Sequence, residues 1–190
     1  MAKVTLNPIL ERVRGQVGDL VFKRYGDELL ISRKPDSEGV EPTEAQLAHR
    51  ERFRQAALYG RLVMADPEAK ALYEGAAKAK GQPIFSLMVA DFFNAPSVDG
   101  VDVSGYAGRV GDPIVVRAHD DFDVAGVHVA VTTADGAAVE AGAAVETPAN
   151  SGRWAYTATA AVPVGTTVRI AVTATDRPGG AVTAAKEKAV

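Results

Sequence analysis

The stretch VRAHDDFDVAGVHVAV (116–131) contains the end of one predicted β-strand, an acidic corner and most of the next strand. In its second half Val127, Val129 and Val131 alternate with smaller or polar residues. Because successive side chains of a strand point to opposite faces, this alternation places the three valines on one buried face. The same alternation returns near the end of the chain, at Val168, Ile170 and Val172.

The residues from Val98 onward are rich in Val, Thr, Ala and Gly, with turn signals every 8 to 12 residues. This pattern is typical of an antiparallel β-sandwich. Trp154 and Tyr156 are the large aromatic residues expected in its core. Seven strands are predicted, at about 101–107, 113–119, 125–133, 137–146, 152–160, 167–175 and 181–187.

Three stretches of this half, VRAHDDFDVAGVHVAV, DGAAVEAG and VRIAVTATDRPGG, resemble parts of the immunoglobulin-like domains of bacterial surface and phage proteins. They correspond to the strand B to C corner, the C to D turn and the penultimate strand of such domains. The resemblance covers residues 98–190. It implies a seven-stranded immunoglobulin-like sandwich and carries no information about a ligand.

Residues 36–96 predict a small module of three helices. Thr43 and Gln46 form a capping box ahead of a helix expected over 44–64. Asp66 and Pro67 begin a second helix, which Gly81 ends. A third helix, PIFSLMVADFF, begins at Pro83 and stops before Ala95. The densest apolar contribution to a small helical core is expected from Phe85, Met88, Val89, Phe92 and Phe93.

The N-terminal stretch GQVGDLVFKRYGDELLISRKP (15–35) predicts a β-hairpin that turns at Gly26 and Asp27 in a type II′ loop. An isolated hairpin is marginally stable in water, and no third strand is predicted before residue 98. We therefore expect another surface to complete the hairpin. The side chains expected at that assembly interface are Leu20, Phe22, Leu29 and Ile31.

This hairpin, followed by TEAQLAHRERF, resembles an uncharacterised bacterial family with a G-x-x-G-[ND]-L-V-F hairpin, an R-x-x-P exit and a T-x-x-Q-x-x-x-R-x-x-F helix. The chain departs from that pattern at Arg33, because its proline follows after one residue rather than two. The resemblance supports the predicted elements and implies no activity.

We predict an α+β chain with three parts: an N-terminal arm and hairpin (1–35), a helical module (36–96) and a β-sandwich (97–190). The domain boundary is placed at Pro96 and Ser97 because the composition changes there.

The acidic corner HDDFDV (119–124) is the strongest candidate for a binding site in the sequence. If strands alternate in direction, Asp120, Asp121 and Asp123 meet Asp176 at one pole, with two further aspartates nearby, Asp99 and Asp102. Calcium binds six to eight hard oxygen ligands, which such a corner can supply. The alternative is that these aspartates cap turns and strand ends, as aspartate commonly does. No other cofactor is expected.

Arg50, Arg54 and Arg61 lie close to one stripe of the first helix. The stripe could bind nucleic acid or another acidic partner, or it could be a solvated face balanced by Glu44 and Glu51.

The three histidines, His49, His119 and His128, are too scattered to indicate a zinc site. Ser104, His119 and Asp121 could be drawn as a catalytic triad, but none lies in a nucleophile-elbow context. The sequence therefore indicates a protein without enzymatic activity.

The 190 residues are 47% hydrophobic and carry a net charge of -3, and the second half is the more acidic: residues 96–190 hold 7 Lys/Arg against 11 Asp/Glu. The absence of cysteine excludes disulfides and thiolate chemistry. The first residues lack the apolar core of a signal peptide, and no run is long enough for a membrane span. We expect an extracellular or particle-associated protein, with a cytoplasmic location left open.

These observations favour a structural subunit that forms homo-oligomers or filaments, in an extracellular fibre or a phage-like particle. The hairpin and helices would mediate subunit contacts, for example by β-augmentation, in which a strand adds to the sheet of a neighbouring copy. Two alternatives stay open: a module that binds a glycan or a protein, and a nucleic-acid or acidic-partner binder that uses the arginine stripe.

Overall fold

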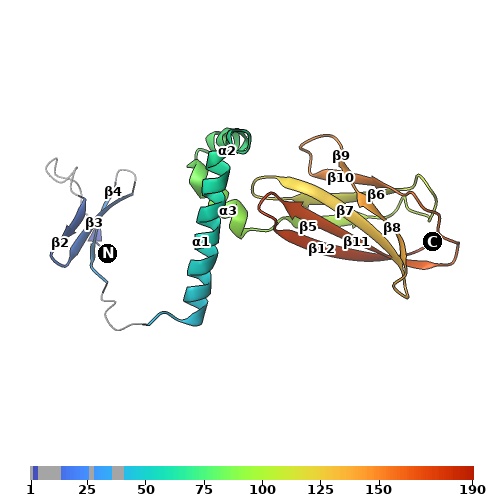
Figure 1. Cartoon of the computed structure of the whole chain (residues 1–190), viewed down its shortest axis with the longest axis horizontal. Helices are drawn as coiled ribbons and strands as arrows, with labels where there is room; N and C mark the ends of the chain where they lie inside the picture. The colour runs from blue at the N-terminus through green and yellow to red at the C-terminus, as the bar shows by residue number, and fades with distance from the viewer. Residues whose placement is uncertain (1, 4–13, 26–27, 36–40) are drawn as a thin grey trace. The chain divides into compact units, whose positions relative to one another are not determined.

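The computed structural model describes residues 2–3, 14–25, 28–35 and 41–190, and within them the chain has an α+β fold of three helices and three four-stranded antiparallel sheets (Figure 1). It forms two compact units, Met1–Glu44 and Ala45–Val190. The helices and the second and third sheets therefore share one unit. A domain boundary at Pro96 and Ser97 stays a prediction.

The first unit contains the small sheet, of strand order β1-β4-β3-β2. Its strands are β1 (Ala2–Lys3), β2 (Gly15–Val17), β3 (Leu20–Tyr25) and β4 (Glu28–Arg33). The predicted hairpin is β3 paired with β4, with Phe22 opposite Ile31. The predicted loop at Gly26 and Asp27 lies outside the described residues.

The expectation that the hairpin has no neighbouring strand in its own part of the chain is wrong. β2 pairs with β3 and β1 pairs with β4. Gly18, at a φ of 56°, makes the tight turn between β2 and β3. The two flanking strands have three and two residues, which is too short for a pattern of alternation to show in the sequence.

The second unit begins with helices α1 (Glu44–Ala65), α2 (Pro67–Lys80) and α3 (Ile84–Phe93), close to the predicted ranges. Asp66 caps α2 by accepting hydrogen bonds from the backbone N–H groups of Glu68 and Ala69. Gly81 ends α2 in the left-handed conformation, at a φ of 64°. The local capping signals were therefore sufficient to predict where α2 begins and ends.

The core of the helices differs from the predicted one. It consists of five buried residues, Val63, Tyr73, Ala77, Leu87 and Met88. Of the apolar residues predicted on α3, Met88 is fully buried, whereas Phe85 is 42% exposed. The reason is the orientation of α3 about its own axis, which places Leu87, Met88 and Asp91 on the buried side and the phenylalanines on the flanks.

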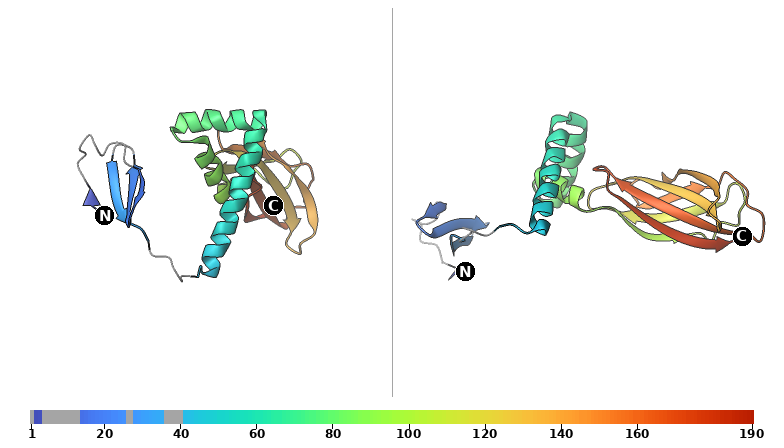
Figure 2. Two further views of the ribbon diagram at one scale, coloured as in Figure 1. Left: turned by 60° about the vertical axis from the view of Figure 1, so that its left-hand side comes forward. Right: turned by 60° about the horizontal axis from the view of Figure 1, so that its bottom comes forward.

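The rest of the second unit is a β-sandwich-like pair of sheets, here called the sheet pair. One sheet contains β5 (Ser97–Asp102), β6 (Pro113–His119), β10 (Arg153–Thr157) and β9 (Val145–Glu146), in that order. The other contains β12 (Ala181–Ala189), β11 (Thr167–Asp176), β7 (Val124–Thr133) and β8 (Ala138–Ala143). The helices lie at one end of the sheet pair and the C-terminus lies at the other (Figures 1 and 2).

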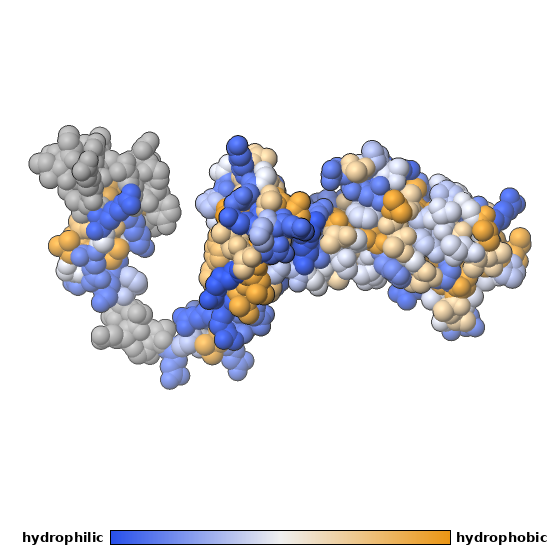
Figure 3. Space-filling model, turned by 45° about the horizontal axis from the view of Figure 1, so that its top comes forward, coloured by the Kyte–Doolittle hydropathy of each residue, from blue (hydrophilic) through white to orange (hydrophobic). Residues whose placement is uncertain are grey.

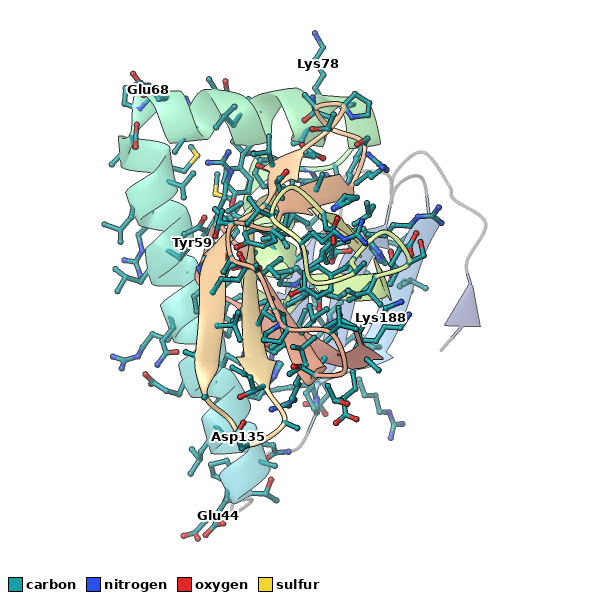
Figure 4. The ribbon with its side chains drawn as sticks, turned by 90° about the vertical axis from the view of Figure 1, so that its right-hand side faces the viewer. Glu44, Tyr59, Glu68, Lys78, Asp135 and Lys188 are labelled. Carbon is teal, nitrogen blue, oxygen red and sulfur yellow. The ribbon has the colours of Figure 1, made fainter. Side chains whose placement is uncertain are left out.

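Two predicted strands need correction. The strand expected over 137–146 divides at Ala144 into β8 and β9, which belong to different sheets. The first strand begins at Ser97 and ends at Asp102, earlier than the predicted 101–107. The first half of the 137–146 stretch, β8, forms a hairpin with β7. The turn between these two strands carries Asp135 at its tip (Figure 4).

The facing sides of the two sheets form one hydrophobic core. The predicted alternating residues of β7 and β11 are all buried there, at Val127, Val129, Val131, Val168, Ile170 and Val172. Trp154 and Tyr156, on β10, are 8% and 4% exposed, which confirms them as core aromatics. Tyr106, which was not predicted as a core residue, is fully buried in the same core.

Each edge strand of the sheet pair carries a feature that discourages pairing with another chain. β5 has a bulge between Val98 and Gly100, and β9 has only two residues. β8 has a bulge, and its Glu140 points inward to the other sheet. β12 carries Lys186 and Lys188.

Among the described residues, no helix has the length and hydropathy needed to cross a membrane.

Candidate functional site at the joint between helices and sheets

The helices contact the sheet pair at a joint formed by α1, α2, α3, the β6–β7 turn and the β11–β12 turn. The ring of Tyr73 on α2 stacks on the ring of Phe122, with centroids 3.9 Å apart. The guanidinium of Arg177 lies 6.0 Å from the centroid of the Phe122 ring. Lys80 and Asn94 donate hydrogen bonds to Asp121, to its carbonyl and its carboxylate respectively. Phe122 is therefore held in the joint by aromatic and cation–π contacts.

Two tyrosines and a carboxylate form a chain of hydrogen bonds in the joint, buried at Tyr73 and Asp91 and partly buried at Tyr59. The hydroxyl of Tyr73 donates to Oδ2 of Asp91, which is fully buried on α3. The hydroxyl of Tyr59, on α1, lies 2.8 Å from the hydroxyl of Tyr73. Tyr59 is labelled on α1 in Figure 4. All three helices are thus linked through one polar chain.

Two buried oxygens of this site have no hydrogen-bond donor among the described residues, Oδ1 of Asp91 and Oδ1 of Asp120. The other oxygen of Asp120 accepts hydrogen bonds from the backbone N–H groups of Phe122 and Asp123, each at 3.3 Å. A buried oxygen without a donor is costly. A proton on Asp91 that is donated to Asp120 would satisfy both oxygens.

The electrostatics of the joint favour such a proton. Burial raises the pKa of Asp91 to about 7, and the neighbouring carboxylates Asp120 and Asp176 add to the shift. Burial also raises the pKa of Asp176, although the backbone N–H groups of Gly179 and Gly180 donate to its Oδ1 at 2.8 and 2.5 Å. The joint therefore holds one carboxyl group, that of Asp91, whose charge changes close to neutral pH.

Asp91 was not predicted as a site residue, because it lies within the apolar run of the third helix. A signal was nevertheless present: Asp91 follows Leu87 by four positions and Met88 by three, which places it on the same buried stripe. A single acid on such a stripe indicates a buried polar contact.

The six aspartates of the predicted calcium corner are divided among several contacts. Asp120 and Asp176 lie within electrostatic range of one another, as predicted. Asp123 pairs with Arg177 at 3.0 Å, and Asp121 accepts from Asn94. Asp102 accepts from the backbone N–H of Ser104 at 2.9 Å, and Asp99 contacts His119 at 2.7 Å.

In the part of the chain that the structure describes, no group of three or more His, Asp or Glu side chains is arranged to hold a metal ion. Calcium at this corner stays a prediction.

His119 does have a serine and an aspartate beside it, but they are not the predicted ones. Ser97 Oγ lies 3.0 Å from Nδ1 and 3.1 Å from Nε2 of His119, and Asp99 contacts the same Nδ1. In a working triad the serine and the carboxylate contact different ring nitrogens. The side chain of His119 is also 68% exposed, so this cluster lacks the geometry of an activated nucleophile.

The arginines of the predicted stripe are exposed on α1. Arg54 donates two hydrogen bonds to Glu51, at 2.7 and 2.9 Å, so its charge is compensated. Arg61 donates to the carbonyl of Ala57, one turn earlier in the helix. Arg52, off the stripe, packs over the ring of Phe93. Binding of an acidic partner to Arg50, Arg54 and Arg61 stays a prediction.

The contacts of the joint connect the three helices to the sheet pair, because most of its polar groups bind one another. The buried carboxyl group of Asp91 can hold a proton near neutral pH. Comparisons of the chain with protein-family models, with curated proteins and with solved structures find no match.

Proposed function

We propose that the chain is a non-enzymatic structural subunit that self-assembles, as part of an extracellular fibre or a phage-like particle. The observation that best supports this is the partly exposed apolar face of the small sheet. Val17 and Leu20 are 66% and 43% exposed, and they share this face with the half-buried Phe22 and Ile31. Leu29, predicted at the interface, is already buried in a single chain, at 3% exposure.

The occupant that we propose for this face is the second unit of another copy. Helix α1 exposes Leu47, Leu58 and Leu62, which recur on one stripe opposite its buried face. Figure 3 shows hydrophobic residues at the surface of both the small sheet and the helices. Each unit therefore offers apolar side chains to the other in a neighbouring copy.

The proposed contact joins two different surfaces, the small sheet of one copy and helix α1 of the next. Such a contact is head-to-tail, and it generates either a ring or a filament.

The sheet edges favour docking through side chains over addition of a strand. The edge strands of the sheet pair carry bulges, lysines or an inward acid, and β1 and β2 are only two and three residues long. The β-augmentation included in the sequence prediction is therefore the less favoured mode of contact.

We propose that the sheet pair is an immunoglobulin-like domain that serves as a spacer or as the exposed face of the assembly. Lettered along the chain from β5 to β12, its sheets have the strand orders A-B-E-D and G-F-C-C′. Immunoglobulin-like domains place strands A, B, E and D in one sheet and C, F and G in the other. This strand order supports the resemblance given by the sequence.

The test is the oligomeric state of the full chain, measured by size-exclusion chromatography with light scattering and by negative-stain electron microscopy. We expect oligomers or filaments that Leu20→Lys disrupts. Gln16→Lys is the matched control, since it adds the same charge to the opposite face of the small sheet. A chain that stays monomeric at high concentration would contradict the proposal, as would equal effects of the two substitutions.

A further inference from the structure

The outer face of the first sheet of the sheet pair carries a groove lined by three basic and two acidic side chains. Its volume is about 440 Å³, within the range of small-ligand sites. Val115 and Gly100 line it together with Arg117, Arg153 and Lys186. Three of the seven Lys/Arg residues of 96–190 therefore lie around one groove in an otherwise acidic half.

Strand register brings the two arginines together. Arg117 on β6 is directly opposite Arg153 on β10, and both side chains are on the exposed face. Like charges directly opposite on neighbouring strands destabilise a sheet. Such an arrangement calls for an anion that compensates it.

The protein itself compensates these charges only in part. Among the described residues, neither guanidinium lies within 4.0 Å of a carboxylate. Arg153 donates to the carbonyl of Thr147 at 3.3 Å, which leaves most of its N–H groups free to bind elsewhere. Asp102 is held by the N–H of Ser104, and Arg117 and Lys186 contribute to lowering its pKa from a distance.

The other parts of the groove complete a shallow binding surface. Gly100 is opposite Arg117 on its other side, and nothing would lie within 4 Å of a Cβ there, so the space above the strand is open. Lys186 reaches across from β12 and donates to the carbonyl of Val101 at 3.1 Å, which fixes its position. Asp99 and Asp102 also line the groove, where their carboxylates can accept hydrogen bonds from hydroxyl groups.

We infer that this groove binds an acidic carbohydrate, with the carboxylate of a sugar ring held between Arg117 and Arg153 and its hydroxyl groups facing Asp99 and Asp102. Arginine matches a carboxylate through two parallel hydrogen bonds. No aromatic side chain lines the groove among the residues that the structure describes, so it does not suit a neutral sugar that binds by stacking, nor a nucleic acid, which uses stacking platforms. The acidic surroundings also disfavour a long polyanion.

The test is titration calorimetry of the full chain with trigalacturonate and with its methyl ester, which is uncharged but otherwise matched. We expect trigalacturonate to bind and the ester to bind at least about tenfold more weakly. Arg117→Gln and Arg153→Gln should each weaken binding of trigalacturonate by a similar factor. Arg169→Gln is the control, because Arg169 is an exposed arginine on the other sheet.

Several outcomes would overturn the inference: no binding of trigalacturonate, equal binding of the ester, or equal loss in the control variant. Binding of a short single-stranded oligodeoxynucleotide in preference to trigalacturonate would overturn it in favour of a nucleic-acid site. Thermal melting of each variant shows that it is folded. Because the groove is remote from the small sheet in sequence and uses none of its residues, failure here would leave the assembly proposal intact.

Discussion

Phe122, in the β6–β7 turn, lies almost flat on Tyr73 of α2, with the two ring planes within 17° of parallel. This stack packs against the core of the helices. We expect Phe122→Ala to lower the free energy of unfolding of the second unit by about 2 kcal/mol, less than a fully buried phenylalanine would cost. Urea denaturation measures the change. Leu72→Ala, on the exposed side of α2, should cost much less, and equal costs would show that the stack is not a principal contact of the joint.

The pKa of Asp91 predicts how the stability of the joint depends on pH. Folding raises this pKa from 3.8 to about 7, so the folded state holds a proton that the unfolded state releases at lower pH. The stability from that proton is fully present below the unfolded pKa and is lost as pH rises through about 7. The groups that act on Asp91 are Tyr73, Tyr59, Asp120 and Asp176, and Arg177 acts on Tyr59.

We therefore expect the free energy of unfolding, measured by urea denaturation, to decrease by on the order of a few kcal/mol between about pH 5 and pH 8. Asp91→Asn should flatten this dependence, because an amide can keep the contact with Tyr73 and donate to Asp120 without titrating. Asp99→Asn, outside the joint, is the control. A wild-type curve that is flat over this range would contradict the prediction.

Glu140 fastens the edge strand β8 to the opposite sheet. Its Oε2 accepts hydrogen bonds from the hydroxyl of Tyr156 at 2.9 Å, from the N–H and hydroxyl of Thr159 at 2.6 and 2.7 Å, and from the N–H of Ala160 at 3.1 Å. Burial alone would raise the pKa of Glu140, but these hydrogen bonds outweigh it and lower the pKa. The stability that they supply is therefore lost as pH falls through the lowered pKa.

We expect Glu140→Ala to cost about 1.5 to 3 kcal/mol at neutral pH, the range for hydrogen bonds to a charged group. Thermal melting provides the measurement. Glu187→Ala, at an exposed position on β12, should be nearly neutral. A Glu140→Ala protein as stable as the control would show that the network has no net effect.

The opposed arginines predict a substitution that stabilises the fold. Removing one charge of the Arg117 and Arg153 pair should raise the free energy of unfolding by about 0.5 kcal/mol. Arg117→Gln tests this by chemical denaturation at low salt, where the repulsion is strongest. The gain should vanish at high salt, and a loss of stability at both salt concentrations would contradict the prediction.

Local signals in the sequence were sufficient for much of the fold. The Asp66–Pro67 start and the Gly81 end of α2 depend on neighbouring residues alone, and both were predictable. The alternating valines of β7 likewise indicate their own buried face. The division of 137–146 was not predictable, because its residues are mostly Ala, Gly and Val and the exchange between sheets at Ala144 depends on pairing partners elsewhere.

The candidate sites depended more on tertiary contacts. The approach of Asp120 to Asp176 was predicted from alternating strand direction, whereas Asp91 comes from a helix that no such rule positions. Arg117 and Arg153 become neighbours only through the register of β6 on β10, which a single sequence does not specify.

The bulges, short strands, lysines and inward acid at the edges of the sheet pair also bear on how an assembly would come apart. Contacts between copies made only by side chains respond to salt, pH and mild denaturant, whereas continuous backbone ladders between chains resist all three. An assembly of this chain should therefore dissociate and reassociate when salt or pH changes. Its copies should also stay free of amyloid-type fibrils at high protein concentration.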